Sequence, residues 1–137
     1  MVKSNILSED FANIANRYDF SALKNQSVFI TGSTGLIGSQ LVLFLDYLNQ
    51  TKDLGINIYA LCRSEEKAKR VFADSFLHIH CVVGDVLNLP SISDSIDYVV
   101  HGASITASKE FINHAVETID IAVNGTLNLL RFANEKK

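Results

Sequence analysis

A glycine-rich stretch, Thr31-Gly32-Ser33-Thr34-Gly35-Leu36-Ile37-Gly38, stands between two apolar segments of different kinds. Before it, residues 27–31 form a short run rich in β-branched and aromatic side chains, which predicts a buried strand. After it, residues 36 to about 48 are apolar on almost every side, so we expect a helix that is buried on most faces. The stretch therefore predicts a turn from a buried strand directly into a buried helix.

The glycines of this turn have separate physical roles. Gly32 permits the tight turn, Gly35 lets a pyrophosphate approach the backbone, and Gly38 lets the helix pack closely against the sheet. The unpaired amides and the dipole at the helix start then attract phosphate groups. The alternative is a glycine-rich turn without a ligand, and the strand and helix around the motif argue against it. The loop residues expected to contact a dinucleotide are Gly32, Thr34, Gly35, Leu36, Ile37 and Gly38.

Further strands and helices alternate along the rest of the chain. The predicted strands are residues 56–62, 78–83 and 97–101, and the predicted helices are residues 65–72, capped by Ser64, and a long helix from Ala107 or Ser108 to about Asn134. This alternation requires parallel strands joined by helical crossovers. It predicts an α/β protein with a doubly wound, Rossmann-type sheet of strand order 3-2-1-4, truncated before a fifth strand.

The first 26 residues form a unit of their own, a helical extension before the dinucleotide-binding segment of residues 27–137. Ser8 is the expected N-cap of its helix, because acidic residues follow it in the first turn. Phe11, Ile14, Ala15 and Tyr18 have the spacing of a single helix face, so we expect them to be packed together.

Composition excludes several classes of protein. The 137 residues carry 12 Lys and Arg against 15 Asp and Glu, a net charge of −3, which argues against a basic surface for nucleic acid. No apolar run approaches the roughly 18 residues of a membrane helix, and we expect no membrane partner. Two cysteines cannot form a disulfide framework, so a cytoplasmic, reduced protein is expected.

The pattern Thr-Gly-x-x-Gly-x-x-Gly resembles the short-chain dehydrogenase/reductase superfamily. The form that begins at Thr31 is similar to its extended branch, which includes nucleotide-sugar epimerases, dehydratases and related reductases. The resemblance extends from about residue 27 to residue 134. It implies an NAD or NADP cofactor, hydride transfer on a small-molecule substrate, and a homodimer formed through the last helix, although core packing alone would also explain that helix.

Two more segments match the resemblance. In Gly84-Asp85-Val86, the resemblance implies that Asp85 and the adjoining Val86 meet the adenine ring, whereas an Asx-turn leaving the strand is the structural alternative for Asp85. In the segment His101-Gly102-Ala103-Ser104, it implies that the backbone at Ala103 and Ser104 runs along the ribose and pyrophosphate. Ile105 and Thr106 would then lie towards the nicotinamide.

At His101 and at the segment of residues 122–126, the resemblance does not carry over a catalytic role. We expect His101 to hold the neighbouring loop rather than to act as a catalyst. In Val123-Asn124-Gly125-Thr126, Ala122 stands where the superfamily has its functional asparagine, so no role is carried over to Asn124.

The end of the second predicted strand bears on the choice between NAD and NADP. An acidic residue about 20 positions beyond the loop would bind the ribose 2′-hydroxyl of NAD. Cys62 occupies that position, and Arg63 and Ser64 follow it. A guanidinium suits a 2′-phosphate because it offers paired donors. The hypothesis is therefore a preference for NADP, with Arg63 and Ser64 as the clamp, and the alternative is a surface arginine.

Two pairs of residues suggest metal or redox chemistry only weakly. His78 and His80 have the spacing of one strand face, but no third ligand stands near them, so no metal site is expected. Cys62 and Cys81 fall on neighbouring predicted strands and lack the Cys-x-x-Cys spacing of redox sites. We expect them to be buried side chains.

The superfamily's acid/base pair, Tyr-x-x-x-Lys, is absent from the 137 residues, so no catalytic residue is predicted. We expect the pair beyond Lys137, after a fifth strand. Two hypotheses follow. The chain is the cofactor-binding part of an oxidoreductase, epimerase or dehydratase acting on a nucleotide-sugar-like substrate, or of an NADP-dependent carbonyl reductase. Alternatively, it is a complete, non-catalytic dinucleotide-binding module.

Overall fold

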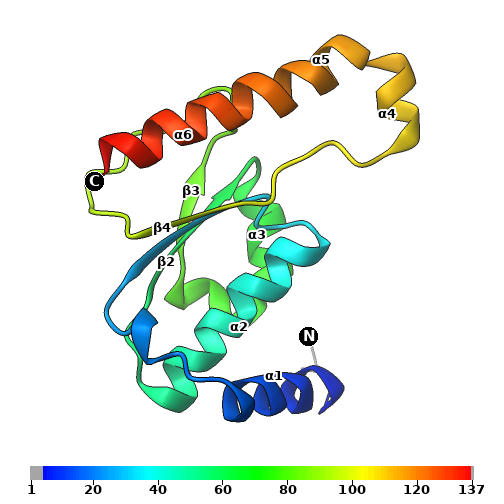
Figure 1. Cartoon of the computed structure of the whole chain (residues 1–137). Helices are drawn as coiled ribbons and strands as arrows, with labels where there is room; N and C mark the ends of the chain where they lie inside the picture. The colour runs from blue at the N-terminus through cyan, green and yellow to red at the C-terminus, as the bar shows by residue number, and fades with distance from the viewer. Residues whose placement is uncertain (1–4, 137) are drawn as a thin grey trace.

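The computed structural model describes residues 5–136 as a parallel sheet between two groups of helices (Figure 1). Helices α1 to α3 lie on one side of the sheet, and α4 to α6 lie on the other. The elements are α1 (Asn5–Arg17), η1 (Ser21–Leu23), β1 (Ser27–Thr31), α2 (Leu36–Lys52), β2 (Asn57–Cys62), α3 (Glu65–Phe72), η2 (Ala73–His78), β3 (His80–Val83), β4 (Tyr98–His101), α4 (Ser108–Asn113), α5 (Ala115–Asp120), η3 (Ile121–Gly125) and α6 (Thr126–Glu135). The short helices η1 and η2 are 3₁₀ helices, and η3 is a π-helix.

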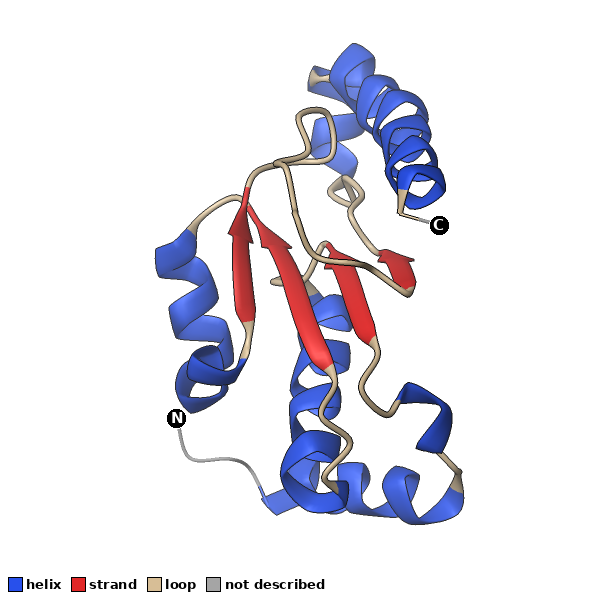
Figure 2. Cartoon of the chain, turned by 90° about the vertical axis from the view of Figure 1, so that its left-hand side faces the viewer, coloured by secondary structure: helices blue, strands red, loops and turns tan. Residues whose placement is uncertain are grey.

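The four strands are all parallel, in the order β3-β2-β1-β4 (Figure 2). The predicted α/β class and strand order are therefore confirmed. The register pairs Ile30 with Ala60 and Thr31 with His101, which aligns the carboxyl ends of β1, β2 and β4. The chain crosses back through α2 and α3 and, between β3 and β4, through the non-helical residues 84–97, so the loops after the parallel strands gather at one edge of the sheet.

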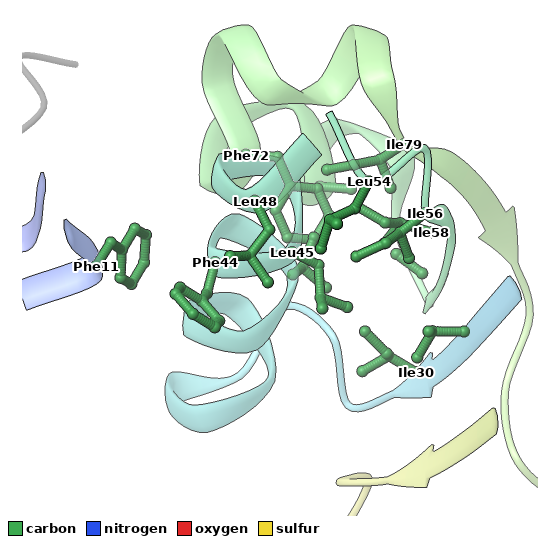
Figure 3. Packing of buried hydrophobic residues seen from close by; sticks show 14 of the residues in the cluster. Phe11, Ile30, Phe44, Leu45, Leu48, Leu54, Ile56, Ile58, Phe72 and Ile79 are labelled. Atoms are coloured by element: carbon green, nitrogen blue, oxygen red, sulfur yellow. The ribbon is translucent and has the colours of Figure 1, made fainter. Parts of the chain in front are cut away.

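Alternate residues of the strands face opposite sides, and each side has its own core. On one side, Ile30 and Ile58 pack under α2 and α3 with Phe72 and Leu48, and we name this set the first cluster (Figure 3). Its full membership is Phe11, Ala15, Val28, Ile30, Val42, Phe44, Leu45, Leu48, Leu54, Ile56, Ile58, Ala60, Cys62, Ala68, Phe72 and Ile79. The first cluster gives α2 its buried position, as its apolar sequence predicts.

The opposite side of the sheet carries a smaller core under α6, which we name the second cluster. Its members are Phe29, Tyr59, Leu61, Val86, Ile96, Leu129 and Phe132. The rings of Phe29 and Phe132 lie 5.0 Å apart, which joins β1 to α6. None of the described helices is both long and apolar enough to cross a membrane.

The N-terminal helix differs from its prediction in its start and its face. The described part of α1 already begins at Asn5, so Ser8 lies inside the helix and is not its N-cap. Phe11 and Ala15 are buried, but Ile14 and Tyr18 are 41% and 58% exposed. The reason is that α1 packs mainly against α2, with the rings of Phe11 and Phe44 5.3 Å apart, and one neighbouring helix covers only a narrow stripe.

The third strand begins later than predicted. β3 starts at His80, and His78 is the last residue of the 3₁₀ helix η2, so the two histidines do not share a strand face. The cause is Asp46 of α2, which is 1% exposed and needs a partner. His78 Nδ1 lies 3.0 Å from Asp46 Oδ1, which holds the chain against α2 before the strand can start. The strands β2 and β4 also begin later than predicted, each by one residue.

The predicted long last helix is broken into pieces. His114, with φ −133° and ψ 52°, separates α4 from α5, and the π-helix η3 separates α5 from α6. All residues of α4 and α5 are described, and none is buried. Without a packed face, no tertiary contact enforces one continuous helix.

Candidate dinucleotide-binding site

The glycine loop forms a turn that excludes side chains. Gly32 has a φ of +67°, and a Cβ built on it would lie 2.4 Å from the carbonyl carbon of Gly102. A Cβ on Gly38 would lie 2.2 Å from the carbonyl oxygen of Gly32. Both contacts are with backbone, which cannot move aside as a side chain could. These positions therefore require glycine, for the turn at Gly32 and for the close packing of α2 at Gly38.

The helix after the loop presents its amino end to the open side of the loop. Its N-cap is Gly35, which has no side chain to bond the first amides, and the Ser39 N–H donates to the Gly35 carbonyl at 2.9 Å. The side chains of Leu36 and Ile37 are 85% and 83% exposed. Amides before the first helical bond lack intrahelical partners and carry the positive end of the dipole. The residues present thus fit a pyrophosphate at this loop.

Ser33 fixes the loop to the neighbouring strand. Its side chain is fully buried, and its hydroxyl donates to the carbonyl of Leu61 in β2 at 2.7 Å. Sequence reasoning missed this residue, because a serine between glycines has no pattern that names its partner. The bond makes the carboxyl end of β2 a support for the phosphate loop.

A pocket of about 590 Å³ opens above the carboxyl ends of the strands. It brings together eleven of the twelve predicted site residues, and the exception is Ser64. Those that line it are Gly32, Thr34, Gly35, Leu36, Ile37, Gly38, Arg63, Asp85, Val86, Ala103 and Ser104. Ile105 and Thr106 line it as well, together with Lys67 and Ile121, which the sequence did not indicate.

Asp85 shapes the turn that follows β3. Its Oδ1 accepts hydrogen bonds from the backbone amides of Leu87 at 2.8 Å and Asn88 at 3.1 Å. This is the Asx-turn that was the structural alternative. Asp85 also lines the pocket, so its contact with adenine remains a prediction.

The end of β2 carries a neutral side chain where an NAD-binding protein has a carboxylate. Burial, followed by the nearby Cys81, raises the pKa of the Cys62 thiol to about 12. The two sulfur atoms lie 2.9 Å apart and both cysteines are free, with Cys62 buried in the first cluster. Cys62 itself therefore carries no negative charge at neutral pH.

The cations on the same rim are Arg63 and Lys67. Both are exposed, both line the pocket, and neither takes part in an ion pair within residues 5–136. Ser64 lies between them as the N-cap of α3, where its hydroxyl accepts from the Lys67 amide at 3.2 Å and donates to Glu66 Oε2 at 3.0 Å. The predicted cap of α3 is therefore confirmed, and the clamp role of Ser64 remains a prediction.

The loop after β4 is bonded to Thr31, and the side chain of Thr31 also contacts His101. Its Nδ1 lies 2.8 Å from Thr31 Oγ1, and its Nε2 lies 3.2 Å from Thr126 Oγ1. Thr31 Oγ1 also accepts the amide of Ala103 at 3.2 Å. Thr31 therefore holds the loop directly, His101 contacts Thr31, and the loop-holding role of His101 stays a prediction.

Other parts of the molecule offer less chemistry. Within residues 5–136, no group of three or more His, Cys, Asp or Glu could hold a metal ion. His80 stacks on Tyr59 with ring centroids 4.6 Å apart.

A second hollow of about 640 Å³ lies between residues 87–92 and α6, away from the glycine loop. Beside it, the Lys136 ammonium donates to the carbonyls of Ile92 and Asp94. The glycine loop is therefore the candidate dinucleotide site.

Comparison with known protein families agrees with this geometry. A family model described as "NAD dependent epimerase/dehydratase family" matches residues 28–137. The matched residues include all four strands, the glycine loop and the helices of both faces from α2 onward. The family implies a nicotinamide dinucleotide cofactor. With the match covering most of its length, the chain belongs to the NAD dependent epimerase/dehydratase family.

Proposed function

We propose that the chain binds NADP(H) in the pocket above the glycine loop, as the cofactor-binding part of an oxidoreductase of the short-chain dehydrogenase/reductase type. The observation that carries this proposal is the cradle of Gly32, Gly35 and Gly38, where any side chain would meet backbone and where α2 begins without a capping side chain. Such a cradle accepts a pyrophosphate at the helix start.

The preference for NADP rests on the charges around the adenosine end of the pocket. Cys62 is neutral there, whereas Arg63 and Lys67 supply two cations without ion-pair partners among the described residues. A 2′-phosphate would meet positive charge and no opposing carboxylate at the end of β2. A guanidinium can bind it through two donors.

The chemistry of a bound nicotinamide is hydride transfer, and the protein must add an acid/base group for it. The 137 residues contain no Tyr-x-x-x-Lys, so this chain supplies cofactor binding and not proton transfer. The substrate we propose for the active enzyme is a nucleotide-sugar-like molecule, and the NADP preference also favours a carbonyl reductase of the same superfamily. The isolated chain should be catalytically silent.

Titration of the chain with NADPH and NADH tests the proposal. We expect weak binding, no tighter than the micromolar range, with NADPH favoured by about 3- to 10-fold over NADH. Arg63→Ala and Lys67→Ala should each reduce that preference. Lys69→Ala is the matched control on α3, because Lys69 pairs with Glu65 at 2.5 Å and does not line the pocket. Equal affinities for the two dinucleotides would refute the preference, and no binding of either would refute the site.

We further propose that the chain self-associates through α4 to α6. These helices expose large apolar side chains at Phe111, Ile112, Val116, Ile119, Val123, Leu127 and Leu130. Exposed apolar patches of this kind mark contact surfaces. Light scattering should detect a dimer that Ile112→Asp with Val116→Asp disrupts, and a monomer at high concentration would contradict the proposal.

A further inference from the structure

A chain of hydrogen bonds connects two walls of the pocket, with His101 at its centre. At one end it begins at the amide of Ala103, and at the other it ends at the carbonyl of Ala122, beside Ile121. Ala103 and Ile121 both line the pocket. Between these ends stand the hydroxyls of Thr31 and Thr126 and the imidazole of His101.

The direction of each bond follows from what the two end groups can do. An amide can only donate, so Thr31 Oγ1 accepts from Ala103, and its own proton is free to bond His101 Nδ1 at 2.8 Å. A carbonyl can only accept, so the Thr126 hydroxyl donates to Ala122 at 2.6 Å. Thr126 Oγ1 then accepts from His101, 3.2 Å away. The imidazole is therefore an acceptor at Nδ1 and a donor at Nε2.

Burial selects this form of the histidine. Thr31 is fully buried, so a hydrogen on His101 Nδ1 would leave the Thr31 hydroxyl proton without the acceptor it now has. An unsatisfied buried polar group is costly. No carboxylate of residues 5–136 lies within 4.0 Å of either ring nitrogen of His101 to stabilise a positive charge. The neutral Nε2–H tautomer is the form that satisfies every group of the chain.

We propose that His101 is a positioning residue for the dinucleotide, which in its neutral Nε2–H tautomer holds the Gly102–Ala103 wall and the η3–α6 wall of the pocket at a fixed separation. This inference rests on the proposed function of the pocket. The Gly102–Ala103 wall lies so close to Gly32 that a Cβ there would collide with it. The position of this wall therefore also sets the space beside the glycine loop. The other wall is a π-turn, a geometry that is uncommon and often found at functional sites.

The test uses the whole chain, labelled with ¹⁵N, and a matched pair of variants at Thr126. Two-bond ¹H–¹⁵N spectra of the imidazoles report the tautomer directly, without any cofactor. We expect the Nε2–H tautomer in the wild type and in Thr126→Ser, which keeps the hydroxyl. In Thr126→Val, which keeps the shape and loses the hydroxyl, we expect a mixture of tautomers. NADPH affinity should fall about 3- to 10-fold in Thr126→Val and stay unchanged in Thr126→Ser, with the circular dichroism of both like the wild type.

The possible results separate the two proposals. An Nδ1–H tautomer in the wild type would overturn the inference, and so would a folded Thr126→Val with wild-type NADPH affinity. If the wild type shows the Nε2–H tautomer but binds neither NADPH nor NADH, the proposed function fails and the positioning role fails with it, while the hydrogen-bond chain itself stands.

Discussion

On one face of the sheet α2 buries seven of its residues, whereas on the other face α4 and α5 bury none and α6 buries two. The first cluster joins α1, α2, α3 and the strands (Figure 3). The second cluster is less than half its size. Both faces consist of the same alternating strands. The difference shows that the helices over the first cluster supply most of the core, whereas those over the second leave large apolar side chains exposed and contribute Ile121 of η3 to the pocket.

The sharpest way to break this comparison is to make the same truncation on both faces. Phe72, in α3, is 1% exposed, and Phe111, in α4, is 46% exposed. Phe72→Ala should lower the free energy of unfolding by about 3–5 kcal/mol, because it leaves a cavity in the first cluster. Phe111→Ala should change it by less than about 1 kcal/mol. Urea titrations of both variants measure the two values, and similar losses would mean that the second face is as tightly packed as the first.

The contact between Gly125, the last residue of η3, and Val86, in the loop after β3, offers a smaller perturbation on the side of the second cluster. A Cβ on Gly125 would lie 2.7 Å from Val86 Cγ2, so Gly125→Ala should overpack the second cluster and cost about 1–3 kcal/mol. In the background of Val86→Ala, that methyl group is gone and the same change should be neutral or stabilising, since alanine favours the helix. A double-mutant cycle measures the coupling, and additive effects would contradict the contact.

The elements that the sequence predicted well are those whose causes are local. β1 was predicted with its observed bounds, Ser27–Thr31, because an apolar run and a glycine turn define both of its ends. The start of α2 at Leu36 and the cap at Ser64 depend equally on neighbouring residues. The strand order followed from the alternation of strands and helices, which leaves parallel topologies few choices.

The elements that escaped prediction depend on partners that are distant in sequence. His78 is drawn out of β3 by Asp46, 32 residues before it. The break at His114 occurs where α4 and α5 lack a core to pack against, whereas the π-turn η3 packs Gly125 and Ile121 on the second cluster. At the site, no motif in the sequence marked Lys67, and only the position of α3 brings it to the pocket. The gathering of the glycine loop with Asp85 and Ala103, in contrast, was implied by the resemblance to the short-chain dehydrogenase/reductase superfamily.

Helix capping gives a further, weaker contrast between the two faces. On the face of the first cluster, Ser64→Ala removes the cap of α3 and should lower the free energy of unfolding by about 1 kcal/mol. On the face of the second cluster, the N-cap of α4 is Ala107, whose extended backbone suits a residue with a capping side chain. Ala107→Ser should raise helicity by circular dichroism yet change the free energy of unfolding by less than about 0.5 kcal/mol, because α4 is not packed. A large gain would mean that α4 unfolds with the core.

The smallest effect at neutral pH comes from two groups that become important only in alkali, one on each face. Burial, with Cys81 nearby, raises the pKa of Cys62 from 9.0 to about 12, and burial, with a hydrogen bond to Asp94, raises the pKa of Tyr59 from 10.0 to about 12. A raised pKa means that the folded chain holds the proton more tightly than the unfolded chain does. The free energy of unfolding should therefore be steady below about pH 9 and fall as the pH rises towards about 12.

The two groups can be separated by where this fall begins. Cys62→Ala should remove the part that starts near the unfolded pKa of the thiol, 9.0, and Tyr59→Phe the part that starts near that of the phenol, 10.0. Tyr18→Phe, at a tyrosine that is 58% exposed, is the control for the loss of a hydroxyl. Urea titrations under reducing conditions from about pH 8 to about pH 11 would give the curves. If Cys62→Ala lost stability along the wild-type curve from pH 9 upward, the first cluster would not be holding the thiol proton.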